Sequence, residues 1–215
     1  GGDRFRSAFS DLSQQITETT GWLFIIGVNI FVVFCFWVAF GKYGNKRLGG
    51  KKALPEFSLF AWFSMLFSAG MGIGLLYFSV SEPIQHYAQP PIPLGSNPDL
   101  AIQALDFTFL HYGLHAWAIY CVVGLSLAYY AFNRKLPFSL RSIFFPILGR
   151  KINSIYGDII DIIAVVATLF GLATSLGFGA KQIASGLNYL FQIDSGVGTQ
   201  IIIIAVITLI ATISV

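Results

Sequence analysis

A cluster of glycines interrupts an uncharged stretch of the chain at residues 57–81. Here Ser68 and Ala69 are followed by Gly70-Met71-Gly72-Ile73-Gly74, so three glycines lie within five residues. Each glycine costs about 1 kcal/mol of helix propensity relative to alanine. Irregular backbone at membrane depth is tolerated only where protein or a cavity surrounds it. The cluster therefore predicts either a broken helix whose freed backbone groups face a ligand or ion, or close helix packing through a GxxxG spacing.

Aromatic side chains gather in a second motif, which reads His111-Tyr112-Gly113-Leu114-His115-Ala116-Trp117-Ala118-Ile119-Tyr120. On a continuous helix, Tyr112, Trp117 and Tyr120 fall within an arc of about 140°. Quaternary ammonium groups cannot donate hydrogen bonds, and proteins recognise them through aromatic faces and cation–π attraction. The motif thus predicts one wall of a box for a methylated cation. The alternative is ordinary packing, or a place in the aromatic belt of the membrane interface.

Two histidines of the same motif, His111 and His115, could reach one metal ion from a continuous helix. Asp106 is the further ligand type nearest to them in the sequence, so hydrogen bonding to other helices is the favoured interpretation. A membrane metalloenzyme using both histidines stays open as a function from another class. The chain has no nucleotide-binding loop, nucleophile elbow or metalloprotease motif. We therefore do not expect an enzyme, or a metal other than a transported or coupling ion.

Hydroxyl groups form a third set, at Thr168, Thr174 and Ser175. In a membrane-spanning helix such groups usually bond to the carbonyl groups of the preceding turn or to a neighbouring helix. Next to unwound backbone they could instead bind Na⁺, a hard cation that prefers oxygen ligands. Asp158 and Asp161 precede this set and favour a helix N-terminus through the helix dipole. We assign no proton transfer to them.

The composition describes an integral membrane protein. Of 215 residues, 55% are hydrophobic and 11% are charged, and the mean hydropathy is +0.72. Soluble domains carry about 25% charged residues. The net charge of +3 is small and gives no indication of nucleic-acid binding. Cys35 and Cys121 both lie inside apolar stretches, which favours core or lipid-facing positions over a disulfide or metal pair.

The uncharged stretches predict five membrane spans, each able to cross a hydrocarbon core of about 30 Å. They cover residues 21–40, 57–81, 107–132, 162–180 and 195–215, and an amphipathic helical lead-in precedes them at residues 1–20. The loops at residues 41–56 and 133–151 carry five Lys or Arg residues each, whereas the other connecting loops hold only Lys181. The positive-inside rule places both basic loops in the cytoplasm. We expect a multi-pass protein of the cell membrane, divided into a lead-in with first span and basic loop (1–56) and the remaining helices (57–215).

Together, the three motifs resemble those of the betaine/carnitine/choline transporter (BCCT) family. The motifs are Phe67 to Leu75 with Ser81-Glu82-Pro83 and His86-Tyr87, then His111 to Tyr120, then Thr168-Leu169-Phe170-Gly171 with Thr174 to Gly179. The resemblance covers nearly the whole chain in order. It implies an all-α integral membrane protein, namely part of a LeuT-like inverted-repeat bundle with a broken glycine-rich helix. It also implies a homotrimer, and a fragment that covers roughly the second to sixth spans of the family.

The resemblance further implies which residues meet the substrate and the coupling ion. Substrate-binding residues would be Gly70, Met71, Gly72 and Gly74 near the break, with Tyr112, Trp117 and Tyr120 on the aromatic face. Sodium-binding residues would be Ser68 and Met71, with Thr168 at one side of a second ion position. Two departures from the family pattern stand out. Tyr112 replaces a common tryptophan, and Leu172 stands where a hydroxyl would accompany Thr168.

Gly74 bears on the choice of substrate. Choline carriers of the family tend to have an acidic residue there, whereas a glycine suits a zwitterion whose own carboxylate an acid would repel. Met71 also resembles the sodium-coupled members. We expect a Na⁺-coupled symporter of glycine betaine or a related trimethylammonium osmolyte, with the substrate between the glycine break and the aromatic face. A Na⁺-independent carnitine exchanger and a proton-coupled choline carrier are the alternatives within the family.

Overall fold

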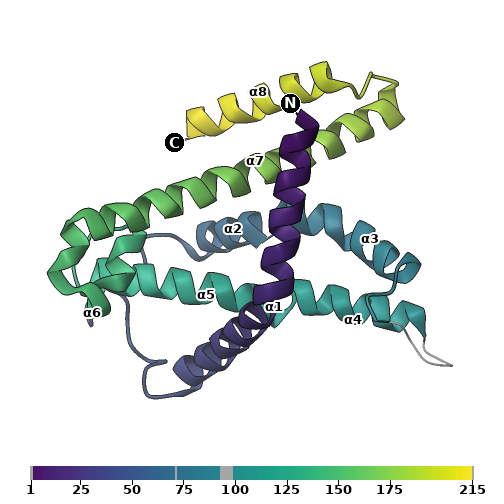
Figure 1. The fold of residues 1–215 in the computed structure, drawn as a ribbon. Coiled ribbons are helices and arrows are strands. Elements are labelled where there is room, and N and C mark those ends of the chain that lie inside the picture. Colours follow the sequence, from purple (N-terminus) through teal and green to yellow (C-terminus); the bar gives the residue numbers. More distant parts are fainter. Residues whose placement is uncertain (1, 71, 93–98, 215) are drawn as a thin grey trace. The chain divides into compact units, whose positions relative to one another are not determined.

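The chain folds into helices, and a long connection at residues 41–58 joins α1 to α2 (Figure 1). A computed structural model describes residues 2–70, 72–92 and 99–214, and every regular element among them is helical. The α-helices are α1 (Gly2–Phe40), α2 (Leu59–Gly70), α3 (Ile73–Ala88), α4 (Leu100–Tyr112), α5 (Leu114–Ala128), α6 (Phe145–Leu148), α7 (Ile155–Phe191) and α8 (Val197–Ser214). A π-helix covers Tyr129–Asn133, and 3-10 turns cover Leu140–Phe144 and Gly149–Asn153. The predicted all-α class is confirmed.

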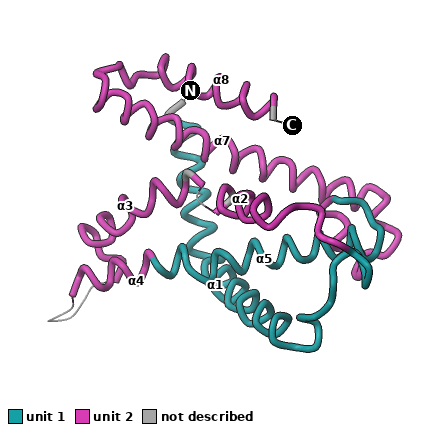
Figure 2. The backbone as a smooth tube through the Cα atoms, turned by 180° about the vertical axis from the view of Figure 1, so that it is seen from behind, with its two compact units in different colours: residues 1–53, 109–138 teal, residues 54–108, 139–215 magenta. Residues whose placement is uncertain are grey.

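The helices form two compact units, coloured separately in Figure 2. Unit 1 contains residues 1–53 and 109–138, and unit 2 contains residues 54–108 and 139–215. The boundaries follow packing and not chain order, because α5 returns to pack against α1. The sequence division at residue 56 describes order along the chain and stays a prediction. Each unit is described by itself below.

Unit 1 is built on the pairing of α1 with α5. The predicted amphipathic lead-in is helical. It runs without interruption into the first span, so that both form the single helix α1. Ala118 of α5 is only 5% exposed, because a small side chain lets the two helices approach closely. The basic loop after α1 is joined to the end of the π-helix by Asn133, whose Oδ1 accepts a hydrogen bond from the Gly49 amide at 2.9 Å. The Asn133 Nδ2 donates to the Arg47 carbonyl at 3.1 Å, so this one side chain fixes the basic loop after α1.

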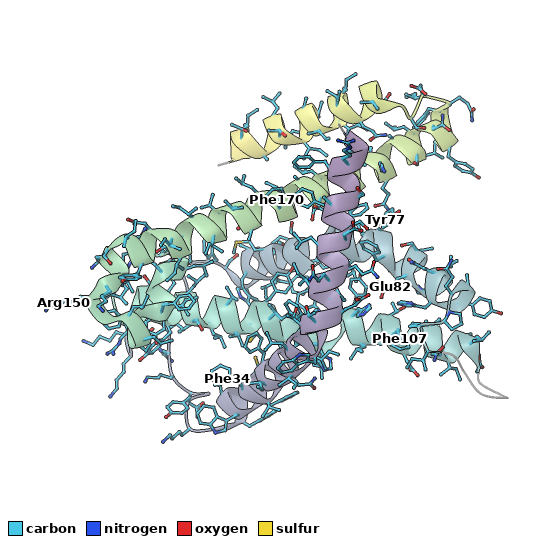
Figure 3. The ribbon with its side chains drawn as sticks, viewed as in Figure 1. Phe34, Tyr77, Glu82, Phe107, Arg150 and Phe170 are labelled. Atoms are coloured by element: carbon cyan, nitrogen blue, oxygen red, sulfur yellow. The ribbon has the colours of Figure 1, made fainter. Side chains whose placement is uncertain are left out.

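Unit 2 is organised around α7, which contacts α3 and α8. The Phe178 ring of α7 stacks on Tyr77 of α3 with centroids 5.3 Å apart, and meets Phe78 edge-on at 5.6 Å. Tyr77 is labelled on α3 in Figure 3. Small residues on the same helix allow close approach, and Ala180 and Ala184 are buried to 0% and 1% exposure. This aromatic and small-residue packing holds α3 against α7.

Three helical stretches of the described residues are long and apolar enough to cross a membrane. They are Ser7–Phe40, Leu100–Asn133 and Ile155–Phe191. Of the five predicted spans, the second and fifth are shorter as helices. The second span is divided into α2 and α3 by a break in the glycine cluster, so neither half alone has the length of about 20 residues that a span needs. The uncharged stretch at residues 57–81 is therefore longer than either of the two helices that it forms.

Candidate functional site

The glycine cluster contains a helix break within unit 2. Helix α2 ends at Gly70, α3 begins at Ile73, and Gly72 between them is extended, with φ −65° and ψ 166°. Met71 lies outside the described residues. Among the residues that the structure describes, no side chain caps the start of α3, where the Leu76 amide donates to the Gly72 carbonyl at 3.2 Å. The broken-helix interpretation of the glycines is therefore the one that the structure adopts.

A helix break of this kind exposes unpaired backbone groups. The last carbonyl groups of α2 and the first amide groups of α3 have no partner within their own helices. The helix dipoles add a partial negative charge at the end of α2 and a partial positive charge at the start of α3. At this one break, the end of α2 therefore attracts a cation and the start of α3 attracts a carboxylate. Ser68 lies in the last turn of α2, next to the end that attracts a cation.

Gly74 stands in the first turn of α3 and has open space beside it. A Cβ atom built at Gly74 meets no atom of another part of the described chain within 4 Å. Close packing through Gly70 and Gly74, the alternative interpretation of the cluster, is thus not seen at Gly74 in the part of the chain that the structure describes. The position has room for a ligand beside the backbone.

Thr168 lies on α7 near the level of the break. Helices α3 and α7 run in the same direction (Figure 1) and meet at Tyr77 and Phe178. At 1.5 Å per residue, stepping back five residues along both helices to the level of Gly72 covers about 7.5 Å, which ends about one and a half helical turns from Thr168. The Thr168 hydroxyl donates to the Ala164 carbonyl at 2.8 Å. Its oxygen keeps lone pairs with which it could bind a cation, whereas Leu172 one turn on brings no oxygen.

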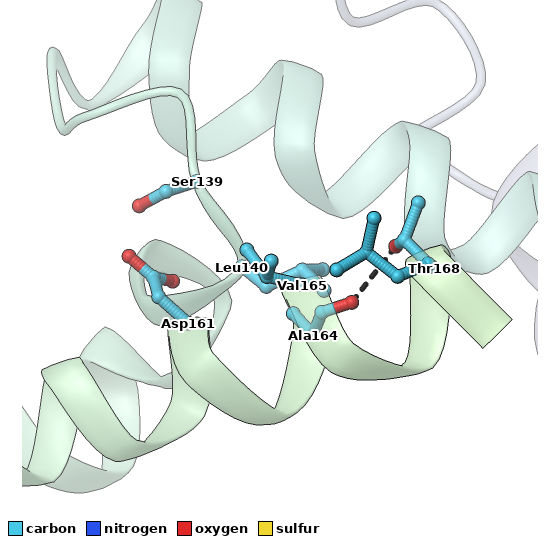
Figure 4. Close-up of a pocket in the computed structure, with 7 residues that line it drawn as sticks. Ser139, Leu140, Asp161, Ala164, Val165 and Thr168 are labelled. Carbon is cyan, nitrogen blue, oxygen red and sulfur yellow. Dashed lines mark hydrogen bonds between the residues drawn. The ribbon is translucent and has the colours of Figure 1, made fainter.

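A cavity of about 360 Å³ lies beside Thr168 in unit 2 (Figure 4). Asp161, Ser139 and Leu140 line it toward the N-terminal end of α7. The Ser139 hydroxyl is buried and has no hydrogen-bond partner within the described residues. Most of the remaining lining is aliphatic. The cavity extends along α7 from Asp161, which forms an ion pair with Arg141, to Thr168 in the middle of the helix.

Arg141 ties the segment before α7 to the first two turns of that helix. Its Nε donates to Asp161, its backbone amide donates to Asp161 Oδ1 at 3.1 Å, and a terminal nitrogen lies 3.0 Å from Asp158 Oδ1. Another terminal nitrogen approaches the Ile152 carbonyl at 3.4 Å. The hydrogen bond to Asp161 raises the pKa of Arg141, so the guanidinium stays charged at every working pH. The two aspartates do lie at a helix N-terminus, as predicted, and the ion pair with Arg141 adds a role that the sequence did not indicate.

In unit 1, the aromatic motif is divided by a second helix break. Helix α4 ends at Tyr112 and α5 begins at Leu114, with Gly113 between them. The 140° arc calculated for a continuous helix is therefore wrong for Tyr112. The Trp117 indole instead donates to the Tyr112 carbonyl at 3.1 Å across the break. Trp117 and Tyr120 remain on one helix, with ring centroids 5.8 Å apart and exposures of 47% and 72%.

The same break separates the two histidines. His111 belongs to α4 and His115 to α5, so the spacing of one continuous helix does not apply to a shared metal ion. The His115 Nε2 atom lies 3.4 Å from Asn29 Oδ1 on α1, while the Asn29 Nδ2 donates to the Ile25 carbonyl at 2.8 Å. This contact agrees with the favoured interpretation, in which the histidine hydrogen-bonds to another helix.

Gly113, Asn133 and Arg141 were missed as organising residues in the sequence. A weak signal exists for Gly113, since it follows Tyr112 inside an otherwise helical stretch and an isolated glycine costs about 1 kcal/mol of helix propensity relative to alanine. Asn133 and Arg141 act through partners far along the chain. No local spacing could have identified those partners.

The comparisons with known proteins agree with these features. The family model of the betaine/carnitine/choline family transporters matches residues 1–215. The glycine betaine transporter 1 of Vibrio parahaemolyticus is 49% identical over 214 residues, which cover 98% of this chain and 41% of that protein. A glycine betaine transporter of Bacillus subtilis is 46% identical over 213 residues, covering 99% of this chain and 42% of that protein.

A helical membrane protein with a broken glycine-rich helix is the class that the fold defines. The chain belongs to the BCCT family of transporters, which are multi-pass membrane proteins and not enzymes. It spans about two fifths of the length of the curated relatives named above. A further relative in Vibrio parahaemolyticus, 44% identical over 98% of this chain and 38% of its own length, is named a glycine betaine/proline/choline/ectoine transporter.

Proposed function

We propose that the full-length protein is a secondary active transporter that takes up glycine betaine, or a related trimethylammonium osmolyte, together with Na⁺. The observation that carries the proposal is the uncapped break between α2 and α3 in a chain of the BCCT family. Relatives at 49% and 46% identity that are named glycine betaine transporters support the substrate class.

Each unit has its own part in recognition. A glycine betaine molecule has a trimethylammonium group and a carboxylate. The exposed Trp117 and Tyr120 rings offer π faces to the methylated cation, and Tyr112 is joined to them through the Trp117 indole. The partial positive charge at the start of α3, around Gly72 and Gly74, suits the carboxylate. A zwitterion has a chemical group suited to each of the two features, whereas choline has a group suited to the aromatic rings alone.

Sodium would bind at the other end of the break. The end of α2 carries partial negative charge, and Ser68 lies in its last turn. We assign Ser68 and the backbone at Met71 to one sodium position, and Thr168 to a second. Support for the second position is an available hydroxyl oxygen about one and a half helical turns from the level of the break. Leu172 weakens it, since it supplies no ligand one turn further on.

Uptake of radiolabelled glycine betaine into proteoliposomes of the full-length protein tests the proposal. We expect uptake that requires an inward Na⁺ gradient and continues when the pH gradient is collapsed. Uptake without Na⁺ would remove the coupling and favour a carnitine exchanger. A requirement for the pH gradient with choline as the better substrate would favour a proton-coupled choline carrier. The broad substrate range in the name of the 44% identical relative makes choline the competitor to include.

The overall fold and the oligomeric state of the full-length protein are also proposed from membership in the family. We expect the described helices to form part of a LeuT-like inverted repeat and the full-length protein to be a homotrimer in the bilayer. Multi-angle light scattering of the purified protein in detergent measures the oligomeric state, and a monomeric mass would contradict the trimer.

A further inference from the structure

The two cysteines of the chain meet at the contact between α1 and α5 in unit 1. The Cys35 thiol on α1 lies 3.8 Å from the Ala118 carbonyl on α5, with the sulfur as donor. Cys121 follows Ala118 by three residues, which puts it about one turn further on the same side of the helix. A helix carbonyl such as that of Ala118 points toward the residues three and four positions further on, so Cys121 lies next to the place where the Cys35 thiol contacts α5. Both are free cysteines.

Their meeting is unusual for a chain with so few cysteines. The sequence has only two cysteines in 215 residues. A buried residue contacts about 6–12 others, so a second cysteine placed at random would contact the first in at most about 3–6% of cases. The sequence alone favoured two separate apolar positions, because nothing local relates residue 35 to residue 121. Pairing of the thiols is a property of the helix packing.

The thiols also line a shared cavity of about 600 Å³. Its wall includes Tyr43, Lys46 and Asn133, which belong to the basic loop after α1 and the end of the π-helix. A small uncharged molecule could therefore reach the thiols from the end of the unit that carries the polar loop. Cys121 is exposed and Cys35 is half-buried, so the oxidant would meet Cys121 first.

We propose that Cys35 and Cys121 form an oxidisable dithiol that an organic or inorganic hydroperoxide converts to a disulfide joining α1 to α5. In the first step, the Cys121 sulfur attacks the hydroperoxide, which gives a sulfenic acid and releases an alcohol, or water where the oxidant is hydrogen peroxide. In the second step, the Cys35 sulfur attacks the sulfenic acid, so the S–S bond forms and one water leaves. Two thiols are oxidised by two electrons while the O–O bond of the hydroperoxide is reduced.

The disulfide would fasten the helix that carries Trp117 and Tyr120 to its neighbour α1. A cross-link of this kind removes relative movement of the two helices. It would be reversible by a dithiol reductant, as thiol–disulfide exchange requires. Thiols at a cytoplasmic end are reduced under ordinary conditions, so the bond would mark exposure to an oxidant. The proposal concerns unit 1 alone and does not depend on the transported substrate.

The test uses the full-length protein in membrane vesicles treated with tert-butyl hydroperoxide. Remaining thiols are then alkylated, and the digest is examined by mass spectrometry with and without dithiothreitol. We expect a linked pair of peptides containing Cys35 and Cys121, lighter by two hydrogen atoms than the separate peptides and absent after reduction. Sulfinic acid at Cys121 with no linked pair, or no reaction at either thiol, would overturn the proposal.

A shifted pair provides the matched control. In the double variant Cys121→Ser/Val123→Cys, the thiol moves two residues along α5, which turns it by about 200° around the helix. We expect the linked peptide to fall at least tenfold in this variant and to vanish in Cys35→Ser. Linking at the original rate in the shifted variant would show random collision of mobile helices and would contradict a preformed pair. Circular dichroism melting of each variant confirms that the helices are intact.

Discussion

The two helix breaks differ in how they are closed. At the first break, Gly72 is extended, no side chain caps α3, and the space beside Gly74 is open. At the second, a Cβ atom on Gly113 would lie within 2.4 Å of the Phe109 carbonyl oxygen, and the Trp117 indole bridges back to the Tyr112 carbonyl. The first break leaves backbone groups available for a ligand, whereas the second uses them within the protein. A glycine in a membrane helix can therefore either open a site or fix a bend.

The largest expected effect on stability is that of Gly113→Ala. The new methyl group would overlap the Phe109 carbonyl oxygen, so the backbone of the bend would have to move. Overpacking of this kind costs about 1–3 kcal/mol. Thermal unfolding of the purified protein, followed by circular dichroism, should show a clear fall in the midpoint. An unchanged midpoint would mean that the second break is as open as the first.

The second-largest effect is expected for removal of the Trp117 ring, and it concerns substrate binding. Trp117→Ala removes a π face and the donor to the Tyr112 carbonyl, and we expect glycine betaine binding to weaken about 10- to 30-fold. Trp117→Phe keeps a π face and should weaken binding by only a few-fold, as cation–π energies of about 0.5–1 kcal/mol allow. Isothermal titration calorimetry with the full-length protein measures both. If both substitutions change binding equally and negligibly, Trp117 serves helix packing and does not bind the substrate.

Thr168→Val tests whether the hydroxyl on α7 acts beyond its own helix. The hydroxyl bonds only to the Ala164 carbonyl of the preceding turn in the described residues, so its loss should change the free energy of unfolding by about 1 kcal/mol or less. If Thr168 binds Na⁺, half-maximal uptake should require a higher Na⁺ concentration. A Na⁺ dependence equal to that of the unmodified protein would remove Thr168 from the proposed sites.

Gly74→Ala should have the smallest effect on folding and is the counterpart of Gly113→Ala. A built Cβ meets nothing within 4 Å, and alanine favours the helix over glycine by about 1 kcal/mol. The midpoint of thermal unfolding should stay the same or rise slightly. A large fall would show that the space beside Gly74 is filled in the full-length protein, and would then support close packing at this glycine.

Much of the architecture was predictable because it depends on local patterns. The continuity of α1 follows from apolar spacing that carries through the lead-in, and the start of α4 follows from Asp99, whose Oδ1 accepts the Ala101 amide at 3.0 Å. The break after Gly70 follows from the poor helix propensity of clustered glycines. The division at Gly113 was not predicted, since a helix usually tolerates a single glycine despite a cost of about 1 kcal/mol relative to alanine.

The residues of the candidate site stay a prediction from the sequence, and the contacts that hold them came from the structure. Trp117 and Tyr120 form a ring pair because they share one face of α5, as three-residue spacing requires. Tyr112 joins them through its backbone carbonyl, which no side-chain pattern reveals. Arg141 needs both the 3-10 turn and the first turns of α7 to reach its two carboxylates.

The amino-acid sequence alone determined the membrane class, the order of the helices and membership in a transporter family, and it gave a break in the glycine cluster as one of two interpretations. These properties depend on hydrophobic length, helix propensity and motifs that are contiguous along the chain. Only the tertiary structure decided that Asn133 holds the basic loop, that Arg141 anchors α7, and that Cys35 meets Cys121. Each of those contacts joins residues far apart in sequence, and packing between helices, not local spacing, chooses the partners.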